Sequence, residues 1–171
     1  FPLGLQASWA EEQLATLSLR DKVAQLFVVA VDQTNVKLVS KLVEKQHIGG
    51  IILFTDNIQD QCALIRDLQI KSKLPLLTMQ DAEWGFAMRL KDAPSYPKNI
   101  TLGAIQQLGL LQQYGMTIGL QAQALGIHLV LGPVVDINKA GNNPVIGVRA
   151  FSDNPERVTA CARAFLSGLH G

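Results

Sequence analysis

Four short runs of apolar residues are spaced along the chain, and turn-forming or polar residues bound each of them. Each run is nearly continuous in branched or bulky apolar side chains, which is typical of buried β-strands. The runs occupy residues 26–30, 50–54, 76–80 and 128–132. Strands that lack a strict apolar and polar alternation are expected to pair in parallel and to be covered on both faces of their sheet.

Between these runs, apolar positions recur three or four residues apart, which is the spacing of an amphipathic helix. The clearest example is residues 108–125, where Gly115 on the apolar face leaves room for a close neighbour and Gly126 ends the helix. A last helix is predicted to begin at the capping residue Asn154, with Pro155 at its first position. Shorter helices are predicted over residues 8–17, 18–22, 36–43 and 62–68, and a longer connection over residues 92–105.

A strand followed by a helix, four times over, indicates an α/β fold. Four such units make half of a TIM-type (β/α)8 barrel, and a complete barrel takes about 250 residues. We therefore interpret the chain as the truncated N-terminal portion of such a barrel, with residues 1–17 as an N-terminal extension or short helix and residues 18–171 as the barrel portion. The alternative is a small doubly wound sheet. The first predicted strand is not followed by a G-x-G-x-x-G motif, which argues against that alternative.

The composition agrees with a folded α/β domain and excludes several classes of function. Of the 171 residues, 48% are hydrophobic and 17% are charged, and the net charge is +1. Because the sequence contains no basic cluster, a nucleic-acid partner is not expected. No apolar run approaches the roughly 18 to 20 residues of a membrane span. Cys62 and Cys161 have no C-x-x-C or ligand-like spacing and are predicted to be free thiols.

The sequence leaves the cellular compartment open. Residues 1–7 are apolar and end in a small residue, as the tail of a trimmed secretion signal would, but no basic segment precedes them. A bacterial periplasmic or secreted location and a cytoplasmic one are therefore both kept as alternatives.

Polar side chains follow the third apolar run, at the point where a parallel strand would end. Asp81 and Glu83 come directly after this run, Trp84 stands beside them, and Arg89 follows a few residues later. The carboxyl ends of parallel strands carry the chemistry in α/β proteins, so these residues lie where a functional site is expected. The alternative interpretation is a strand that simply ends in a polar loop.

A long polar loop follows the fourth apolar run, and loops of this length without regular structure are usually functional. It contains Asp136, Arg149 and the three asparagines Asn138, Asn142 and Asn143. For the asparagines, turn formation is the simpler explanation. Asp136 is either a binding residue or an acceptor that fastens the loop. Arg149 stands among apolar residues and is costly to bury unless an anionic or hydroxylated group meets it.

These two polar stretches resemble the strand-end motifs of glycoside hydrolase family 3. The sequence DAEWG followed by MRL resembles the family motif after the third barrel strand, and GPVVDIN with NPVIGVRAF resembles the motif after the fourth. LSLRDKVAQLF, IGGIILF and PKNITLGA agree with the family in the same order, so the resemblance covers nearly the whole chain from Leu17 onward. Trp84 and Phe86 replace a glycine and an arginine of many members, which matches a DAEWG subgroup and leaves the exact sugar open.

The resemblance implies a retaining glycosidase that acts on terminal β-linked sugars, most like the bacterial β-N-acetylhexosaminidase branch, with β-glucosidase as the second choice. It implies a carbohydrate substrate, such as a cell-wall glycan, and no cofactor or metal. Asp81, Arg89 and Arg149 would hold sugar hydroxyls beside the cleaved bond, and Asp136 would support them from beneath. A carboxylate accepts two hydroxyl hydrogen bonds and a guanidinium offers a rigid fork of donors, so these residue types suit that role.

The catalytic groups of a family 3 enzyme are not expected within these 171 residues. Retaining hydrolysis needs a nucleophilic carboxylate and an acid/base group on opposite sides of the cleaved bond. In the family, a K-H-x-P-G-H-G loop after the fifth strand and a later aspartate supply them, so we assign Glu83 a binding or loop-bracing role. The expected partner is the C-terminal remainder of the same barrel. The alternative is a non-catalytic α/β module that binds sugar or serves as a scaffold.

Overall fold

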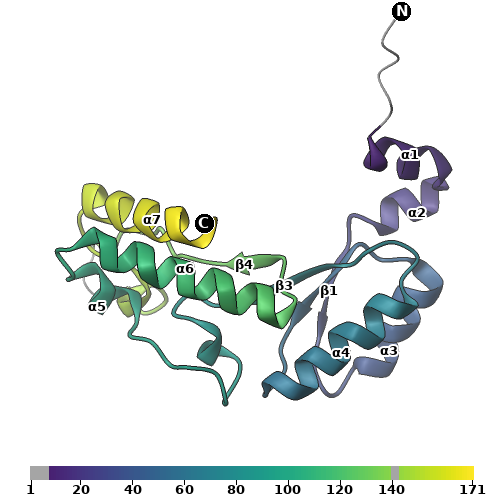
Figure 1. Ribbon diagram of the computed structural model, residues 1–171, viewed down its shortest axis with the longest axis horizontal. Coiled ribbons are helices and arrows are strands. Elements are labelled where there is room, and N and C mark those ends of the chain that lie inside the picture. The colour runs from purple at the N-terminus through teal and green to yellow at the C-terminus, as the bar shows by residue number, and fades with distance from the viewer. Residues whose placement is uncertain (1–7, 140–142) are drawn as a thin grey trace, which may run out of the picture.

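The computed structural model describes residues 8–139 and 143–171, and within them four parallel strands form one sheet. The strands are β1 (Val28–Val31), β2 (Gly50–Leu53), β3 (Leu77–Asp81) and β4 (Leu129–Leu131). They lie side by side in chain order, and each neighbouring pair is parallel (Figure 1). Successive barrel strands have this order, whereas the strand order of a doubly wound sheet reverses. The prediction of an α/β fold built from four consecutive βα units is confirmed.

Helices connect these strands, and every predicted helix is present. They are α1 (Trp9–Thr16), α2 (Leu19–Ala24), α3 (Val36–Lys41), α4 (Ile58–Lys71), α5 (Asn99–Gly103), α6 (Leu108–Leu125) and α7 (Pro155–Leu169). Short π-helical or 3-10 turns occupy Leu42–Gln46, Phe86–Met88 and Gly147–Arg149. The sequence pattern does not predict α5, because five residues are too few to display a helical period. The longer connection predicted over residues 92–105 therefore contains one short helix, α5.

Local capping signals fix several helix ends. The hydroxyl of Ser8 accepts a hydrogen bond from the backbone N–H of Glu11, and the Glu11 carboxylate accepts one from the backbone N–H of Ser8. This reciprocal pair is a capping box, and it begins α1. The Asn154 side chain caps α7 by accepting a hydrogen bond from the backbone N–H of Arg157, and Gly126 ends α6 in the left-handed conformation with φ 71°. These residues carry their signals locally, which is why the sequence locates these ends well.

The helices cover one face of the sheet and form the main core with it. Val31, Ile51 and Leu53, at alternating strand positions, are fully buried in one cluster with side chains from α3, α4 and α6. Leu68 of α4 and Ile118 of α6 are likewise fully buried in that cluster. Figure 1 shows α3 and α4 at one end of the molecule, and α6 and α7 packed side by side at the other.

The opposite face of the sheet is left uncovered by the described part of the chain. Strand register places Val28, Leu77 and Leu129 on this face, and these side chains are 39%, 41% and 42% exposed. In a closed barrel the same face is the packed interior. The expectation that both faces are covered is therefore wrong for this chain alone. Four βα units supply helices for the outer face but no opposing strands for the inner face.

Helices α6 and α7 approach each other closely enough for their backbones to touch. A Cβ atom added at Gly115 would lie 2.0 Å from the carbonyl oxygen of Phe165, and one added at Gly168 would lie 1.9 Å from that of Gln112. Any larger residue at either position would force the helices apart. The prediction that Gly115 admits a close neighbour is confirmed, and so is the prediction that Cys62 and Cys161 are free thiols.

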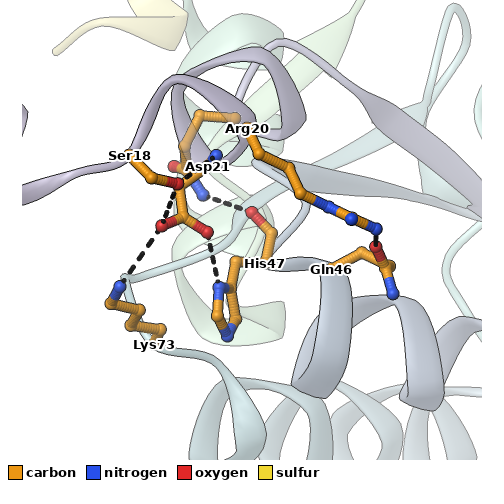
Figure 2. Close-up of polar contacts among 7 residues, drawn as sticks. Ser18, Arg20, Asp21, Gln46, His47 and Lys73 are labelled. Carbon is orange, nitrogen blue, oxygen red and sulfur yellow. Dashed lines mark hydrogen bonds and ion pairs between the residues drawn. The ribbon is translucent and has the colours of Figure 1, made fainter.

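A polar cluster at the amino ends of the strands attaches α2 to the sheet (Figure 2). His47 Nδ1 lies 2.8 Å from one carboxylate oxygen of Asp21. The hydroxyl of Ser18 donates to the other oxygen at 2.9 Å, and Lys73 Nζ lies 3.6 Å from it. Neither α1 nor α2 contains a buried residue, so polar contacts contribute much of this attachment. Three segments meet here: α2, the turn before β2 and the turn before β3.

The Asp21 carboxylate is expected to make the stability of the protein depend on pH. The pKa of Asp21 is lowered from its ordinary value of 3.8 to about 2, chiefly by its hydrogen bond with His47. A carboxyl whose pKa is lower in the folded state stabilises the fold above its unfolded pKa, and this contribution is lost as the pH falls toward the folded pKa. We therefore expect Asp21→Asn to lower Tm at neutral pH, and the difference from wild type to narrow below about pH 4.

Thermal melts of both proteins from pH 7 to about pH 3 measure this difference. Asp67→Asn is the matched control, because the Asp67 side chain is 50% exposed and its carboxylate pairs with Lys71 on the same helix. Exposed pairs of this kind contribute little, so the control should lose less at neutral pH. An Asp21→Asn difference that stays constant down to about pH 3 would contradict the assignment.

Candidate functional site

Asp81 lies at the carboxyl end of β3, on the uncovered face of the sheet. Its position follows from the register: Asp81 pairs with Leu131 of β4, and Met79 pairs with Ile52 of β2. Two residues further along, the same register brings Phe54 beside Asp81 on the same face. The Asp81 side chain is 23% exposed. The structure thus brings Asp81 to the end of the strand where the sequence predicts a site.

Arg89 returns to Asp81 from the turn that follows β3. Gly85 opens this turn with φ 93°, a conformation that strongly favours glycine. A short 3-10 turn then carries Arg89 back over the strand end, where one of its N–H groups donates a hydrogen bond to Asp81 Oδ2. The guanidinium carbon lies 4.7 Å from the centroid of the Phe54 ring, which is cation–π distance. Asp81, Arg89 and Phe54 therefore form one cluster.

The turn that carries Arg89 is tied to the loop after β2. The backbone N–H of Lys91 donates to the Asp56 carbonyl at 2.8 Å, and Lys91 Nζ lies 2.8 Å from the Asp56 carboxylate. Both oxygens of Asp92 accept from the backbone N–H of Ile58, at 3.0 and 3.1 Å, at the start of α4. These contacts fix the backbone on either side of the site. The Arg89 side chain itself has less support, because its Nε is buried and has no hydrogen-bond partner among the described residues.

Glu83 and Arg149 form a second arginine–carboxylate pair, and it joins the loop after β3 to the loop after β4. Arg149 Nε donates to one Glu83 oxygen at 2.8 Å and Nη2 donates to the other at 2.7 Å. Glu83 is only 8% exposed. This two-pronged contact raises the pKa of Arg149 above its ordinary range, so the guanidinium stays charged at any physiological pH. Two-pronged pairs of this kind are geometrically specific as well as strong.

Two further contacts hold Arg149 in place. Its Nη1 donates to the carbonyl of Val145 at 3.1 Å, and its own carbonyl accepts from the amide of Asn99 at 2.8 Å. Asn99 belongs to α5 and is fully buried. The anionic partner expected for Arg149 is therefore Glu83 of the same chain. The loop-bracing role assigned to Glu83 agrees with this geometry.

The remaining residues of the polar loop have weaker contacts. Asp136 is exposed, and its carboxylate has no hydrogen bond among the described residues, although its charge acts on Arg149. The supporting role expected for Asp136 therefore stays a prediction. The Asn143 side chain accepts from the backbone N–H groups of Val145 and Ile146, which is turn formation as predicted. Asn142 lies outside the described residues.

A buried hydrogen-bond network behind the site is not apparent from the sequence. Thr55 Oγ1 donates to the amide oxygen of Gln61 at 2.5 Å, and the amides of Gln61 and Gln80 bond each other at 2.8 Å. Thr55 follows β2, Gln61 belongs to α4 and Gln80 belongs to β3. These three side chains are 3%, 0% and 0% exposed. The network therefore joins the ends of two strands directly behind Phe54 and Asp81.

Residues 8–139 and 143–171 contain no group of three or more His, Cys, Asp and Glu side chains arranged to hold a metal ion. No helix there combines the length and the apolar character needed to cross a bilayer.

A family model and the sequences of known proteins were compared with this chain, and their matches agree with one another. The family model described as glycosyl hydrolase family 3 N terminal domain matches residues 18–171. The chain is 36% identical over 164 residues to beta-hexosaminidase LpqI of Mycobacterium tuberculosis, covering 91% of this chain and 40% of that protein. It is 27% identical over 162 residues to a beta-N-acetylglucosaminidase/beta-glucosidase of Cellulomonas fimi, covering 95% of this chain and 29% of that protein.

Solved structures agree with the sequence matches. A structure of M. tuberculosis LpqI superposes with a TM-score of 0.79 at 32% sequence identity, covering 92% of this chain and 47% of that one. The chain thus spans less than half the length of each of these relatives.

The Glu83–Arg149 pair is expected to be a structural brace. Glu83→Gln keeps the shape of the side chain but removes its charge, so a guanidinium is left without its two-pronged partner. We expect the free energy of unfolding, measured by urea denaturation, to fall by about 1 to 3 kcal/mol. Asp136→Asn makes the same chemical change at an exposed carboxylate and should cost less than about 0.5 kcal/mol. Equal losses in the two variants would show that the pair braces nothing.

Proposed function

This chain belongs to glycosyl hydrolase family 3, and on that premise we propose that the protein it forms part of is a retaining glycosidase of terminal β-N-acetylhexosaminides. The observation that carries the proposal is the Asp81–Arg89 pair. It lies at the carboxyl ends of the strands, on the face that becomes the interior of a closed barrel. Sites of barrel enzymes are built at that end. The pair is only partly buried, so a ligand can reach it from the barrel mouth.

The contacts of this pair leave capacity for sugar hydroxyls. Arg89 uses one N–H group on Asp81, and a guanidinium has five such donors in a fixed fork. A carboxylate has two oxygens, so Asp81 can bind Arg89 and still accept from a hydroxyl. In the proposed complex Asp81 accepts from hydroxyls of the terminal sugar, and Arg89 donates to a neighbouring sugar oxygen. Charge-assisted hydrogen bonds of this kind fix the orientation of the ring beside the cleaved bond.

Arg149 and Asp136 have smaller roles in the proposed binding of the sugar. Three of the five Arg149 donors are used by Glu83 and Val145, so Arg149 shapes the pocket wall and offers its remaining donors to the sugar. Asp136 is exposed at the rim, where it contributes negative charge near Arg149. We therefore rank Asp81 and Arg89 as the principal substrate contacts and Arg149 and Asp136 as secondary ones.

The nucleophile and the acid/base group are proposed to come from the remainder of the barrel. Retaining hydrolysis needs both groups, placed on opposite sides of the cleaved bond. The sheet ends on one side with β4, and a groove of about 520 Å³ beside it is lined by α6, α7 and β4. This groove and the uncovered inner face of the sheet suit the docking of further βα units. The partner of this chain is therefore proposed to be the rest of its own barrel.

A β-glucosidase is the second candidate, because the name of the C. fimi relative includes both activities. The two sugars differ at one substituent, an acetamido group against a hydroxyl. The ratio of kcat/KM for chromogenic β-N-acetylglucosaminide and β-glucoside, measured on the full-length protein, separates the candidates. A ratio well above one supports the first, and a ratio below one supports the second.

Residues 1–171 alone are expected to have no glycosidase activity. They carry one side of the proposed pocket and neither of the two groups that retaining hydrolysis requires. The measurement is turnover of a chromogenic β-N-acetylglucosaminide by the purified chain, with the full-length protein as the positive control. Turnover by the chain itself would contradict this division of the site. A full-length protein that binds the sugar without cleaving it would favour the non-catalytic module.

Loss of Asp81 is expected to lower kcat/KM of the full-length protein and not merely to raise KM. Contacts to the sugar beside the cleaved bond tighten as the ring distorts, so they act in the transition state. Truncating a charged, hydrogen-bonded group costs about 2 to 4 kcal/mol, on the order of thirtyfold to a thousandfold in rate. Arg89→Ala should behave similarly, and Asp67→Ala on the outer surface of α4 is the control. Near-normal kinetics in a folded Asp81→Ala variant would remove Asp81 from the substrate site.

A further inference from the structure

The Phe54 ring lies against Arg89, and no contact described above assigns this ring a function. Phe54 directly follows β2 and is half-buried on the inner face of the sheet. The Arg89 guanidinium carbon is 4.7 Å from its ring centroid. We infer that Phe54 is a positioning residue whose ring fixes the orientation of the Arg89 guanidinium toward the sugar. This inference rests on the proposed function for its catalytic consequence.

Arg89 needs a second anchor because its hydrogen bonding to the protein is sparse. One N–H group binds Asp81, and its Nε is buried without a hydrogen-bond partner among the described residues. A single hydrogen bond allows the guanidinium to turn about that contact. Arg149 differs, because two prongs on Glu83 already fix its plane. An aromatic face is the contact that holds a guanidinium without consuming its donors. The Phe54 ring therefore leaves the remaining donors of Arg89 available to a ligand.

The backbone that carries the ring is held beside the backbone of Asp81. The backbone N–H of Phe54 donates to the carbonyl of Val31 at 2.9 Å. The next residue, Thr55, is bound through Gln61 to Gln80, the residue before Asp81. Carboxylate and ring thus stand on two strand ends that one buried network joins. A guanidinium held between two such supports has one favoured orientation.

The variants Phe54→Leu, Phe54→Tyr and Arg89→Ala, with the double variant Phe54→Leu/Arg89→Ala, test this in the full-length protein. Phe54→Leu should lower kcat/KM by about threefold to thirtyfold, the range of a partly buried cation–π contact. Phe54→Tyr keeps the ring and should stay within about twofold of wild type. In the Arg89→Ala background, Phe54→Leu should add less than about twofold, because the group it positions is gone. Equal losses in both backgrounds would overturn the inference.

Phe165→Leu is the matched control, because it removes a ring from the packing between α6 and α7, away from the site. Phe165→Leu should lower Tm, and any change that it causes in kcat/KM should be the same in the wild-type and Arg89→Ala backgrounds. If the loss of kcat/KM in Phe165→Leu depends on Arg89 as strongly as the loss in Phe54→Leu does, the coupling reflects general packing. That result would overturn the inference.

An NMR measurement separates this inference from the proposed function. The Nε–H signal of Arg89 in the full-length protein should carry a ring-current shift in wild type and in Phe54→Tyr, and lose it in Phe54→Leu. This result needs no activity. If wild type hydrolyses neither chromogenic sugar, the proposed function fails, and the signal still decides whether the ring orients Arg89. An Arg89 signal that is the same in wild type and in Phe54→Leu overturns the positioning role.

Discussion

The parallel register of β2 and β3 is the constraint on which the candidate site depends. Side chains alternate between the two faces of a strand, so a slip of one residue would exchange every inward and outward position. Gln80 is fully buried toward the helices, and its neighbour Asp81 stands on the uncovered face. The Thr55–Gln61–Gln80 network fixes this choice, because an unpaired buried amide is costly. Without that register, Arg89 would have no carboxylate to meet.

The two arginine–carboxylate pairs have different roles in the site. Glu83 and Arg149 use both carboxylate oxygens and two guanidinium nitrogens on each other, so this pair joins two loops and leaves little capacity over. Asp81 and Arg89 share a single hydrogen bond and retain capacity for a ligand. A rigid brace beside a pair with free hydrogen-bonding capacity suits a binding site, because side chains that are already ordered lose less entropy when a ligand binds. In the proposed function, this remaining capacity binds hydroxyls of the sugar.

The sequence predicts the elements of this fold well and their contacts only in part. Apolar periodicity locates all four strands and the long helices, because that periodicity is imposed by the core they share. Both faces of the sheet are buried in a closed barrel, and the strands are accordingly apolar on both faces. Their sequence therefore does not reveal that one face is open in this chain. Asp81 and Arg89 are visible as a strand-end motif. The pairing of Glu83 with Arg149 spans 66 residues and has no local signal, and Gln61 is indistinguishable from any polar helix residue.

A crystal structure of the full-length protein with N-acetylglucosamine bound tests the central claim most directly. We expect the sugar at the carboxyl ends of the strands, with its hydroxyls within about 2.7 to 3.2 Å of the Asp81 carboxylate and the Arg89 guanidinium. We also expect the Glu83–Arg149 pair to stay intact beside the sugar and the remainder of the barrel to cover the inner face of the sheet. A sugar bound elsewhere, with Asp81 and Arg89 still facing only each other, would contradict it.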